Sequence, residues 1–154
     1  MRTHSESRLV PYDPDLMFDI VADVERYPEF LPWVADLRVV SRENLKGKEI
    51  KIAEMQIGFH RLRERYTSRV VLDRTARTID VTQVQGVFRD LENRWRFIGD
   101  CGGCRIDFFL RFEFRSRLLS AIAGSAMSLA VSSMTHAFEE RAKKLSALCG
   151  YNSA

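Results

Sequence analysis

The feature that most constrains this chain is the alternation of side chains between residues 105 and 115. Charged residues occupy most of the odd positions. Every even position carries a large apolar side chain, namely Ile106, Phe108, Leu110, Phe112 and Phe114. A period of two is typical of a β-strand with one buried and one solvated face. The segment therefore predicts a sheet with a strongly aromatic inner surface, and such a surface needs a cover.

Further strand-like segments lie upstream at short intervals. They cover residues 4–10, 37–41, 49–59, 62–72, 78–84 and 91–98. From residue 37 onward the connections are short and turn-like, which predicts hairpins and an antiparallel meander. Parallel strands would need longer crossover connections, usually with a helix between them.

Two short helical segments are expected after the first strand. Asp13 is a favourable N-cap, and Pro14 suits the first helical position because an N–H group there has no helical partner. Apolar residues then recur at helical spacing, so the sequence predicts a helix over 14–25. The segment 27–33, rich in proline and aromatic residues, predicts a second helical turn.

Residues 117–148 predict one long C-terminal helix of roughly 45 Å. An apolar stripe follows it at steps of three and four residues: Ala123, Met127, Ala130, Met134, Phe138, Ala142, Leu145 and Leu148. The uncharged stretch 118–135 is long enough for a transmembrane span. Its serines, and the sheet that would otherwise lack a cover, favour a helix buried against that sheet. Its many small residues mean that either the backbone lies very close to the sheet or space remains for a ligand.

The length of 154 residues predicts a single domain over 1–154, of the α+β class. No apolar signal segment opens the chain, so we expect a cytoplasmic protein, with a peripheral location at the inner membrane left open. The three cysteines are then expected to be reduced. Cys101 and Cys104 flank two glycines of a predicted hairpin turn, not a helix N-terminus that would activate a thiol. Whether these two form a disulfide stays open.

Several short motifs carry a resemblance to a known family. They are the string Val10-Pro11-Tyr12, the segment Tyr27-Pro28-Glu29-Phe30-Leu31-Pro32-Trp33, the triplets Ile57-Gly58-Phe59 and Gly86-Val87-Phe88, and the helical stretch Ala137-Phe138-Glu139-Glu140-Arg141-Ala142. Their order and spacing resemble the coenzyme Q-binding Coq10-like proteins of the START-like, or polyketide cyclase/dehydrase-like, superfamily. The resemblance implies a helix-grip fold, also called START/Bet v 1-like, in which a curved antiparallel sheet wraps around a long C-terminal helix.

The resemblance further implies two functions. One is the binding of ubiquinone or another polyisoprenoid in an internal cavity, in support of respiratory electron transport. The other is that of a ribosome-associated toxin that acts on the large subunit. We expect a carrier rather than an enzyme, with no cofactor beyond the bound isoprenoid, no metal and no DNA partner. Peripheral membrane contact is a further expectation.

Candidate site residues follow from both readings. Apolar residues on the predicted inner surface and the cover are expected to line the cavity: Phe30, Trp33, Phe88, Leu91, Trp95, Phe108, Phe112, Met127, Met134 and Phe138. For the alternative function, Arg61, Arg63, Arg65 and Arg69 alternate along one strand and project from the same face. That face is either an ordinary solvated surface or a basic strip for ribosomal RNA or anionic lipid. His136 and Glu140 lie one helical turn apart, but no third ligand completes a metal site.

Overall fold

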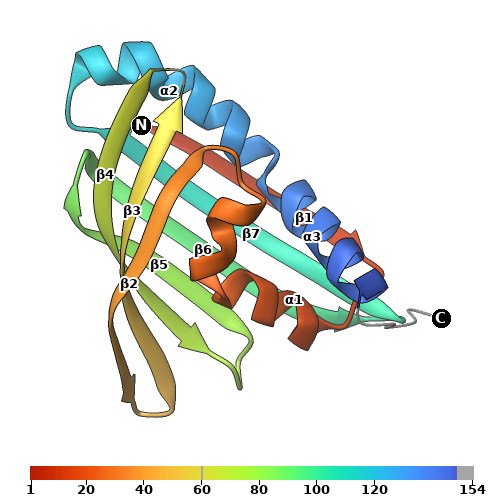
Figure 1. The fold of residues 1–154 in the computed structure, drawn as a ribbon. Coiled ribbons are helices and arrows are strands. Elements are labelled where there is room, and N and C mark those ends of the chain that lie inside the picture. Colours follow the sequence, from red (N-terminus) through yellow and green to blue (C-terminus); the bar gives the residue numbers. More distant parts are fainter. Residues whose placement is uncertain (60, 149–154) are drawn as a thin grey trace.

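The structure is a computed structural model that describes residues 1–59 and 61–148, without the side chains of residues 147 and 148. Figure 1 shows a curved sheet with two C-terminal helices lying across its concave face. The elements are β1 (Arg2–Val10), α1 (Pro14–Ala22), the 3₁₀ helix η1 (Val24–Glu29), β2 (Val34–Leu45), β3 (Lys48–Phe59), β4 (Leu62–Asp73), β5 (Thr78–Gly86), β6 (Phe88–Asp100), β7 (Gly103–Phe114), α2 (Arg117–Ser132) and α3 (Met134–Leu148). The predicted α+β class and order of elements are confirmed.

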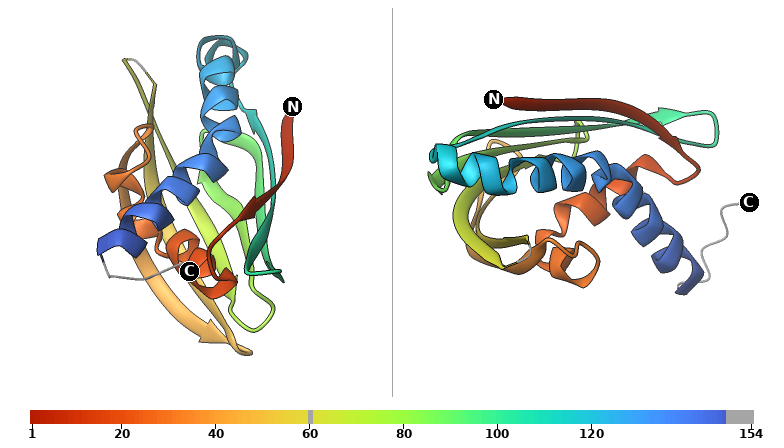
Figure 2. Two further views of the ribbon diagram at one scale, coloured as in Figure 1. Left: turned by 90° about the vertical axis from the view of Figure 1, so that its right-hand side faces the viewer. Right: turned by 90° about the horizontal axis from the view of Figure 1, so that it is seen from above.

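The seven strands form one sheet in the order β1-β7-β6-β5-β4-β3-β2. Every neighbouring pair is antiparallel. Strands β2 to β7 form a meander, and β1, the first strand of the chain, pairs with the last strand, β7. The sheet bends around α2 and α3, as the two views in Figure 2 show. The strands are longer than expected, most of all β2 (Val34–Leu45) and β6 (Phe88–Asp100).

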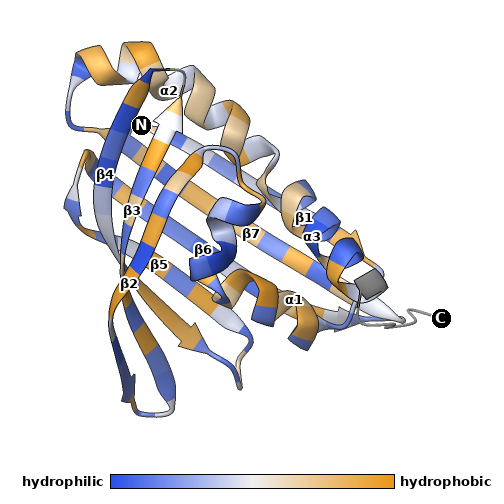
Figure 3. Cartoon of the chain, in the orientation of Figure 1, coloured by the Kyte–Doolittle hydropathy of each residue, from blue (hydrophilic) through white to orange (hydrophobic). Residues whose placement is uncertain are grey.

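The alternation in β7 has the predicted consequence. Its even-numbered side chains are buried without exception, whereas its odd-numbered ones are half-buried or exposed. The aromatic inner surface is therefore real, and α2 and α3 are the cover it requires (Figure 1). Colouring by hydropathy shows the same alternation along the strands (Figure 3).

The helix after β1 starts as predicted and ends early. A carboxylate oxygen of Asp13 accepts a hydrogen bond from the backbone N–H of Asp15 at 2.7 Å, which is the expected N-cap. The predicted end at residue 25 was wrong: α1 stops at Ala22, because the non-helical backbone of Asp23 (φ −83°, ψ 68°) turns the chain into η1.

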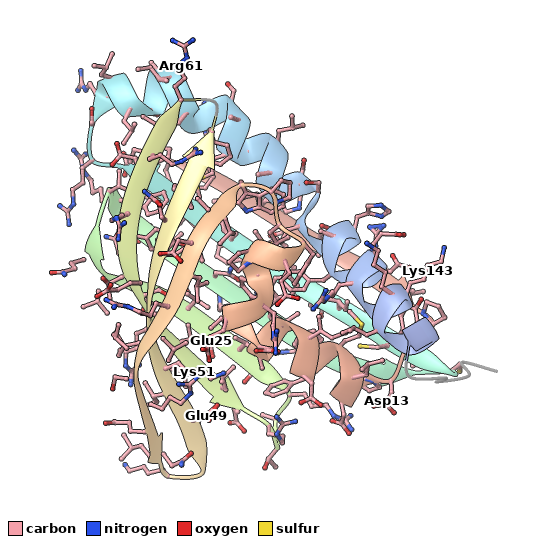
Figure 4. The ribbon with its side chains drawn as sticks, in the orientation of Figure 1. Asp13, Glu25, Glu49, Lys51, Arg61 and Lys143 are labelled. Atoms are coloured by element: carbon pink, nitrogen blue, oxygen red, sulfur yellow. The ribbon has the colours of Figure 1, made fainter. Side chains whose placement is uncertain are left out.

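Two side chains from elsewhere satisfy the carbonyl groups left free at the end of α1. The hydroxyl of Tyr27 donates to the carbonyl oxygen of Val21. The ammonium group of Lys51, a buried lysine on β3, donates to the carbonyl oxygen of Ala22 at 3.0 Å (Figure 4). A cation at a helix C-terminus is favourable because the last carbonyl groups carry partial negative charge.

The prediction of a single long C-terminal helix was also wrong. Residues 117–148 form two helices whose axes differ by 45°, with the break at Ser133. The hydroxyl groups of Ser132 and Ser133 donate to the carbonyl oxygens of Leu129 and Ala130 at 2.8 and 2.9 Å. Such local bonds compete with the regular helical ladder and bend helices. The bend lets α2 follow the sheet while α3 packs against α1.

Gly86, the last residue of β5, is required by its surroundings. Its φ of +141° lies in a region that favours glycine, and a Cβ there would come within 2.4 Å of the Cβ of Tyr66. This close approach lets the end of β5 pair with Tyr66 of β4.

In the part of the chain that the structure describes, no single helix is long and apolar enough to span a membrane. Only α2 and α3 taken together meet the requirements of length and composition, with the 45° bend between them.

Candidate functional site

A cavity lies between the concave face of the sheet and the two C-terminal helices. Its volume is about 80 Å³, several times the roughly 10–15 Å³ that one water molecule needs. Inner-face residues of β2 to β7 form one wall, and Met127, Ala130, Val131, Met134 and Phe138 form the other. The lining is therefore predominantly apolar.

The small residues of α2 account for both outcomes that the sequence left open. Ala130 lies on the cavity wall, where its short side chain leaves room. Gly124 instead permits a close approach, since a Cβ there would lie 2.9 Å from a guanidinium nitrogen of Arg2. Space for a guest and tight packing thus occur on the same helix.

An aromatic cluster closes one end of the cavity. The ring of Phe138, which is fully buried, packs edge-on against Tyr27, Phe30 and Trp95 at centroid distances of 5.3, 5.2 and 5.2 Å. Aromatic rings prefer such edge-to-face contacts. The cluster joins η1, β6 and α3, so it fixes these three elements around the site.

The structure brings together six of the ten cavity residues proposed from sequence. Trp33, Leu91, Trp95, Met127, Met134 and Phe138 line the cavity. Three others are buried but lie outside its lining: Phe108 packs against Trp95 at 4.3 Å, and Phe88 and Phe112 pack against each other at 6.2 Å.

Phe30 lies on the far side of Phe138, outside the lining. The guanidinium of Arg141 lies over its ring, 5.0 Å from the centroid. Both residues line a shallow surface groove between α1 and α3. Phe30 therefore supports the aromatic cluster from outside.

Sequence reasoning missed many lining residues on the middle strands. They include Ala53, Met55, Ile57 and Phe59 on β3, Tyr66, Ser68 and Val70 on β4, Ile79 and Val81 on β5, and Asn93 on β6. The signal was present, because within each strand these residues follow the same period of two that identified β7. Applying that period to every predicted strand would have placed them on the inner face of the sheet, although not in the cavity itself.

Among the described lining residues, Asn93 is the one with a buried polar atom that lacks a hydrogen-bond partner. Its side-chain oxygen is buried and has no hydrogen-bond partner, and its strand neighbours on the same face are Leu91 and Trp95. Burying an amide without a partner costs free energy. An empty cavity thus holds an unsatisfied polar group that a guest could satisfy.

Two tyrosines are the titratable groups among the described lining residues. Burial raises the pKa of both Tyr27 and Tyr66, so their hydroxyl groups stay neutral at physiological pH. That of Tyr66 lies 3.1 Å from the sulfur of Met55. An acid–base pair of the kind that general acid–base catalysis uses is missing from this part of the lining.

The thiols at the β6–β7 turn are not arranged as a redox pair. Cys101 is exposed and Cys104 is buried, and both are free. Burial raises the pKa of the Cys104 thiol to about 11, so this thiol is not activated. Cys149 lies outside the described residues. No group of three metal-ligating side chains occurs within residues 1–59 and 61–148.

The four arginines proposed as a basic strip are all exposed. Arg63, Arg65 and Arg69 share the outer face of β4, and Arg61 precedes that strand, where Figure 4 shows it projecting away from the molecule. Among the ion pairs of the described residues, none involves these four. We call residues 61, 63, 65 and 69 the arginine strip.

A curved antiparallel sheet, C-terminal helices in its grip and an apolar cavity between them define a START-type, Bet v 1-like protein. Over residues 10–139 the chain matches the family described as polyketide cyclase/dehydrase and lipid transport, and it belongs to that family. A START superfamily protein from Mycobacterium smegmatis shares the fold, with a TM-score of 0.78 at 17% identity over 93% of this chain and 98% of that one.

Two curated relatives are similar over most of the chain. The ribosome association toxin RatA of Rickettsia prowazekii is 36% identical, over 94% of this chain and 99% of its own length. The mitochondrial coenzyme Q-binding protein COQ10 homolog B of Xenopus laevis is 34% identical, over 92% of this chain and 58% of its own length. The chain is thus a Coq10/RatA-like member of the family, and these relatives are named for binding or toxin activity.

Proposed function

We propose that this chain is a non-enzymatic carrier that takes up an apolar molecule with a polar head, such as ubiquinone, in the cavity beneath α2 and α3. The observation that supports this most directly is the cavity itself, whose apolar lining encloses a single unsatisfied amide, Asn93. The lipid-transport family and the coenzyme Q-binding relatives support the same function.

Desolvation would drive the uptake. Each buried CH₂ group contributes about 0.8 kcal/mol, so a few isoprene units can outweigh the cost of association. The cavity of about 80 Å³ is smaller than a polyisoprenoid tail. A guest therefore has to widen it, and the bend at Ser133 gives α2 and α3 a place to move apart.

Asn93 would hold the polar head. An amide can donate to a quinone carbonyl through its nitrogen and accept from a quinol hydroxyl through its oxygen. The neutral hydroxyl groups of Tyr27 and Tyr66 lie in the same lining. None of these groups is suited to take and return a proton during a reaction, and this is why we propose a carrier and not a cyclase.

The first test asks whether a guest is present. Native mass spectrometry of the gently purified protein is expected to show a bound isoprenoid, and titration with a short-chain ubiquinone is expected to quench Trp33 and Trp95. A protein that carries no lipid and whose tryptophans do not respond to quinone contradicts the carrier function.

The second test fills the cavity. Ala130→Leu places extra methyl groups inside it and should lower quinone affinity at least tenfold while leaving the fold intact. Ala76→Leu, in the exposed turn between β4 and β5, is the control and should bind normally. Equal quinone affinity in both variants would show that the guest binds elsewhere.

A second candidate function rests on the arginine strip and on the RatA relatives. Four exposed arginines free of ion pairs among the described residues are suited to ribosomal RNA. In this case the triple variant Arg63→Gln/Arg65→Gln/Arg69→Gln should weaken ribosome binding. The slope of the logarithm of the binding constant against the logarithm of the salt concentration should become less negative by about 2–3. The control Arg26→Gln/Arg38→Gln/Arg105→Gln removes the same charge from arginines already paired with acids.

A further inference from the structure

Helix α2 is apolar on both of its sides. Its inner side faces the core and cavity with Ala123, Met127 and Val131, and its outer side carries Leu118, Ile122 and Leu129. These three outer side chains are 71, 60 and 73% exposed. A surface helix normally turns polar residues to water, whereas a helix that is apolar all round is normally buried.

The exposed residues form one line and not a scatter. Steps of four and seven residues place Leu118, Ile122 and Leu129 within about 40° of one another around the helix axis. Small side chains lie between them, namely Ala121, Ser125 and Ser132, all exposed. Figure 3 shows α2 in orange and pale tones, with a blue segment only at its start. We call Leu118, Ala121, Ile122, Ser125, Leu129 and Ser132 the outer face of α2.

Positive charge lies at the start of this face and along one of its sides. Arg117 opens α2, and Arg115 precedes it with its Nε donating to the carbonyl oxygen of Gly86 at 3.1 Å. Arg2 of β1 lies against the middle of the helix, where its guanidinium donates to the hydroxyl of Ser128 at 3.0 Å. Among the described ion pairs, none involves these three arginines. The sequence has no acidic residue from Arg115 to Phe138.

The arginine strip adds to the charge at the same end of the molecule. Arg61 lies at the β3–β4 turn, at the end where α2 begins (Figures 1 and 4). The acidic residue nearest to it on β4, Glu64, pairs across the sheet with Ile57, a cavity residue, so it belongs to the inner face. The outer surface at this end is therefore basic around an apolar centre.

We propose that the outer face of α2 docks onto an anionic phospholipid bilayer. Its leucine and isoleucine side chains enter the boundary between headgroups and acyl chains, and Arg2, Arg115 and Arg117 contact lipid phosphates. Charge complementarity favours this partner, because a second copy of the chain would bring a rim of the same sign. RNA would match the arginines and leave the apolar line exposed to water.

The docking face and the cavity wall are two sides of one helix. Met127, Ala130 and Val131 line the cavity, while Leu129 lies on the outer face, next to the bend at Ser133. A bilayer that holds α2 by its outer face would act directly on the element that covers the cavity. This inference does not depend on the identity of the guest, since it rests on the surface alone.

Vesicle sedimentation of the full chain tests the proposal. The protein is expected to bind vesicles of phosphatidylcholine mixed with phosphatidylglycerol, and to bind pure phosphatidylcholine weakly. Leu118→Ser/Ile122→Ser/Leu129→Ser should reduce binding to the anionic vesicles about a hundredfold. The double variant Arg115→Gln/Arg117→Gln should weaken binding to the anionic vesicles more at low salt than at high salt, because salt screens the attraction between arginine and phosphate charges.

The matched control is Leu9→Ser/Leu45→Ser/Val84→Ser, which removes three similarly exposed apolar side chains from strands. It should bind vesicles like the parent protein. In addition, a tryptophan introduced as Ile122→Trp should show a blue-shifted emission on anionic vesicles, beyond the response of the parent protein.

Vesicles without quinone separate this test from the carrier function, which can fail while docking holds. Absence of binding to anionic vesicles, or equal binding by the two serine variants, would overturn the proposal. The proposal would also be overturned if the parent protein did not bind vesicles and the serine variant of α2 changed its oligomeric state or its ribosome binding. The outer face of α2 would then bind a protein or ribosomal partner.

Discussion

Asn93 contributes its amide to the cavity at a cost to the empty protein. Its side-chain oxygen is buried without a partner, so Asn93→Leu should raise the free energy of unfolding by about 1–2 kcal/mol. The same change should weaken short-chain ubiquinol binding about tenfold, because the quinol hydroxyl donates to the free amide oxygen, and should leave binding of a pure hydrocarbon such as squalene unchanged. Urea unfolding and ligand titration measure the two effects. A variant that loses both ligands equally would show that Asn93 only shapes the cavity.

Cys104 makes stability depend on alkaline pH. Burial raises its pKa from an ordinary 9.0 to about 11 in the folded protein, so the folded state holds the proton more tightly than the unfolded state. This stabilising effect is complete below pH 9 and is lost as the pH rises through 11. Cys104→Ala should make the unfolding free energy less dependent on pH between 9 and 11 by about 2 kcal/mol, measured in urea. The control is Cys101→Ala, which removes an exposed thiol from the same turn.

Among the elements, α1 depends on a contact far away in sequence. Lys51→Met removes the hydrogen bond from the buried ammonium group to the carbonyl oxygen of Ala22. It should lower the free energy of unfolding by about 1.5–3 kcal/mol, as expected for a hydrogen bond from a charged group. Lys48→Met is the control: its ammonium group is half exposed, lies 3.9 Å from a carboxylate oxygen of Asp73, and should change stability by less than about 1 kcal/mol. Similar losses in both variants would contradict a capping role for Lys51.

The helices also show what a local pattern can and cannot predict. Asp13 and Pro14 identify the start of α1 correctly, because an N-cap and an N1 proline act within one turn. Its end at Ala22 depends on Tyr27 and Lys51, whose side chains donate hydrogen bonds to the last carbonyl groups of α1 only in the folded chain. The break at Ser133 could not be predicted from sequence either, since serines inside a helix bend it only where tertiary packing stabilises the bent form.

At the scale of the whole molecule, α3 is fastened more firmly than α2. Arg8 on β1 pairs with Glu139 at 2.9 Å, and Arg141 pairs with Glu29 of η1 at 3.1 Å. Among the described residues, α2 instead has apolar contacts and one side-chain hydrogen bond to the sheet, from Arg2 to Ser128. We therefore expect α2 to open locally before the sheet unfolds.

Hydrogen exchange measures this difference. Amides of α2 should exchange through openings of lower free energy than those of β6 and β7, and bound ubiquinone should slow exchange in α2 more than in β1. Ala130→Leu, with its cavity filled, should show slow α2 exchange without ligand. If α2 is as protected as β7 in the empty protein, the guest cannot enter by movement of this helix.

Sequence alone determined the inner surface of β7, the antiparallel meander and the presence of a helical cover, because side-chain periods of two and near four are properties of local geometry. Only the tertiary structure decided that Trp33, Trp95 and Asn93 face one cavity while Phe30 and Phe88 do not. Membership of a cavity depends on strand register, sheet curvature and the angle of the covering helices. These are set by contacts between residues far apart in the chain, which no local pattern contains.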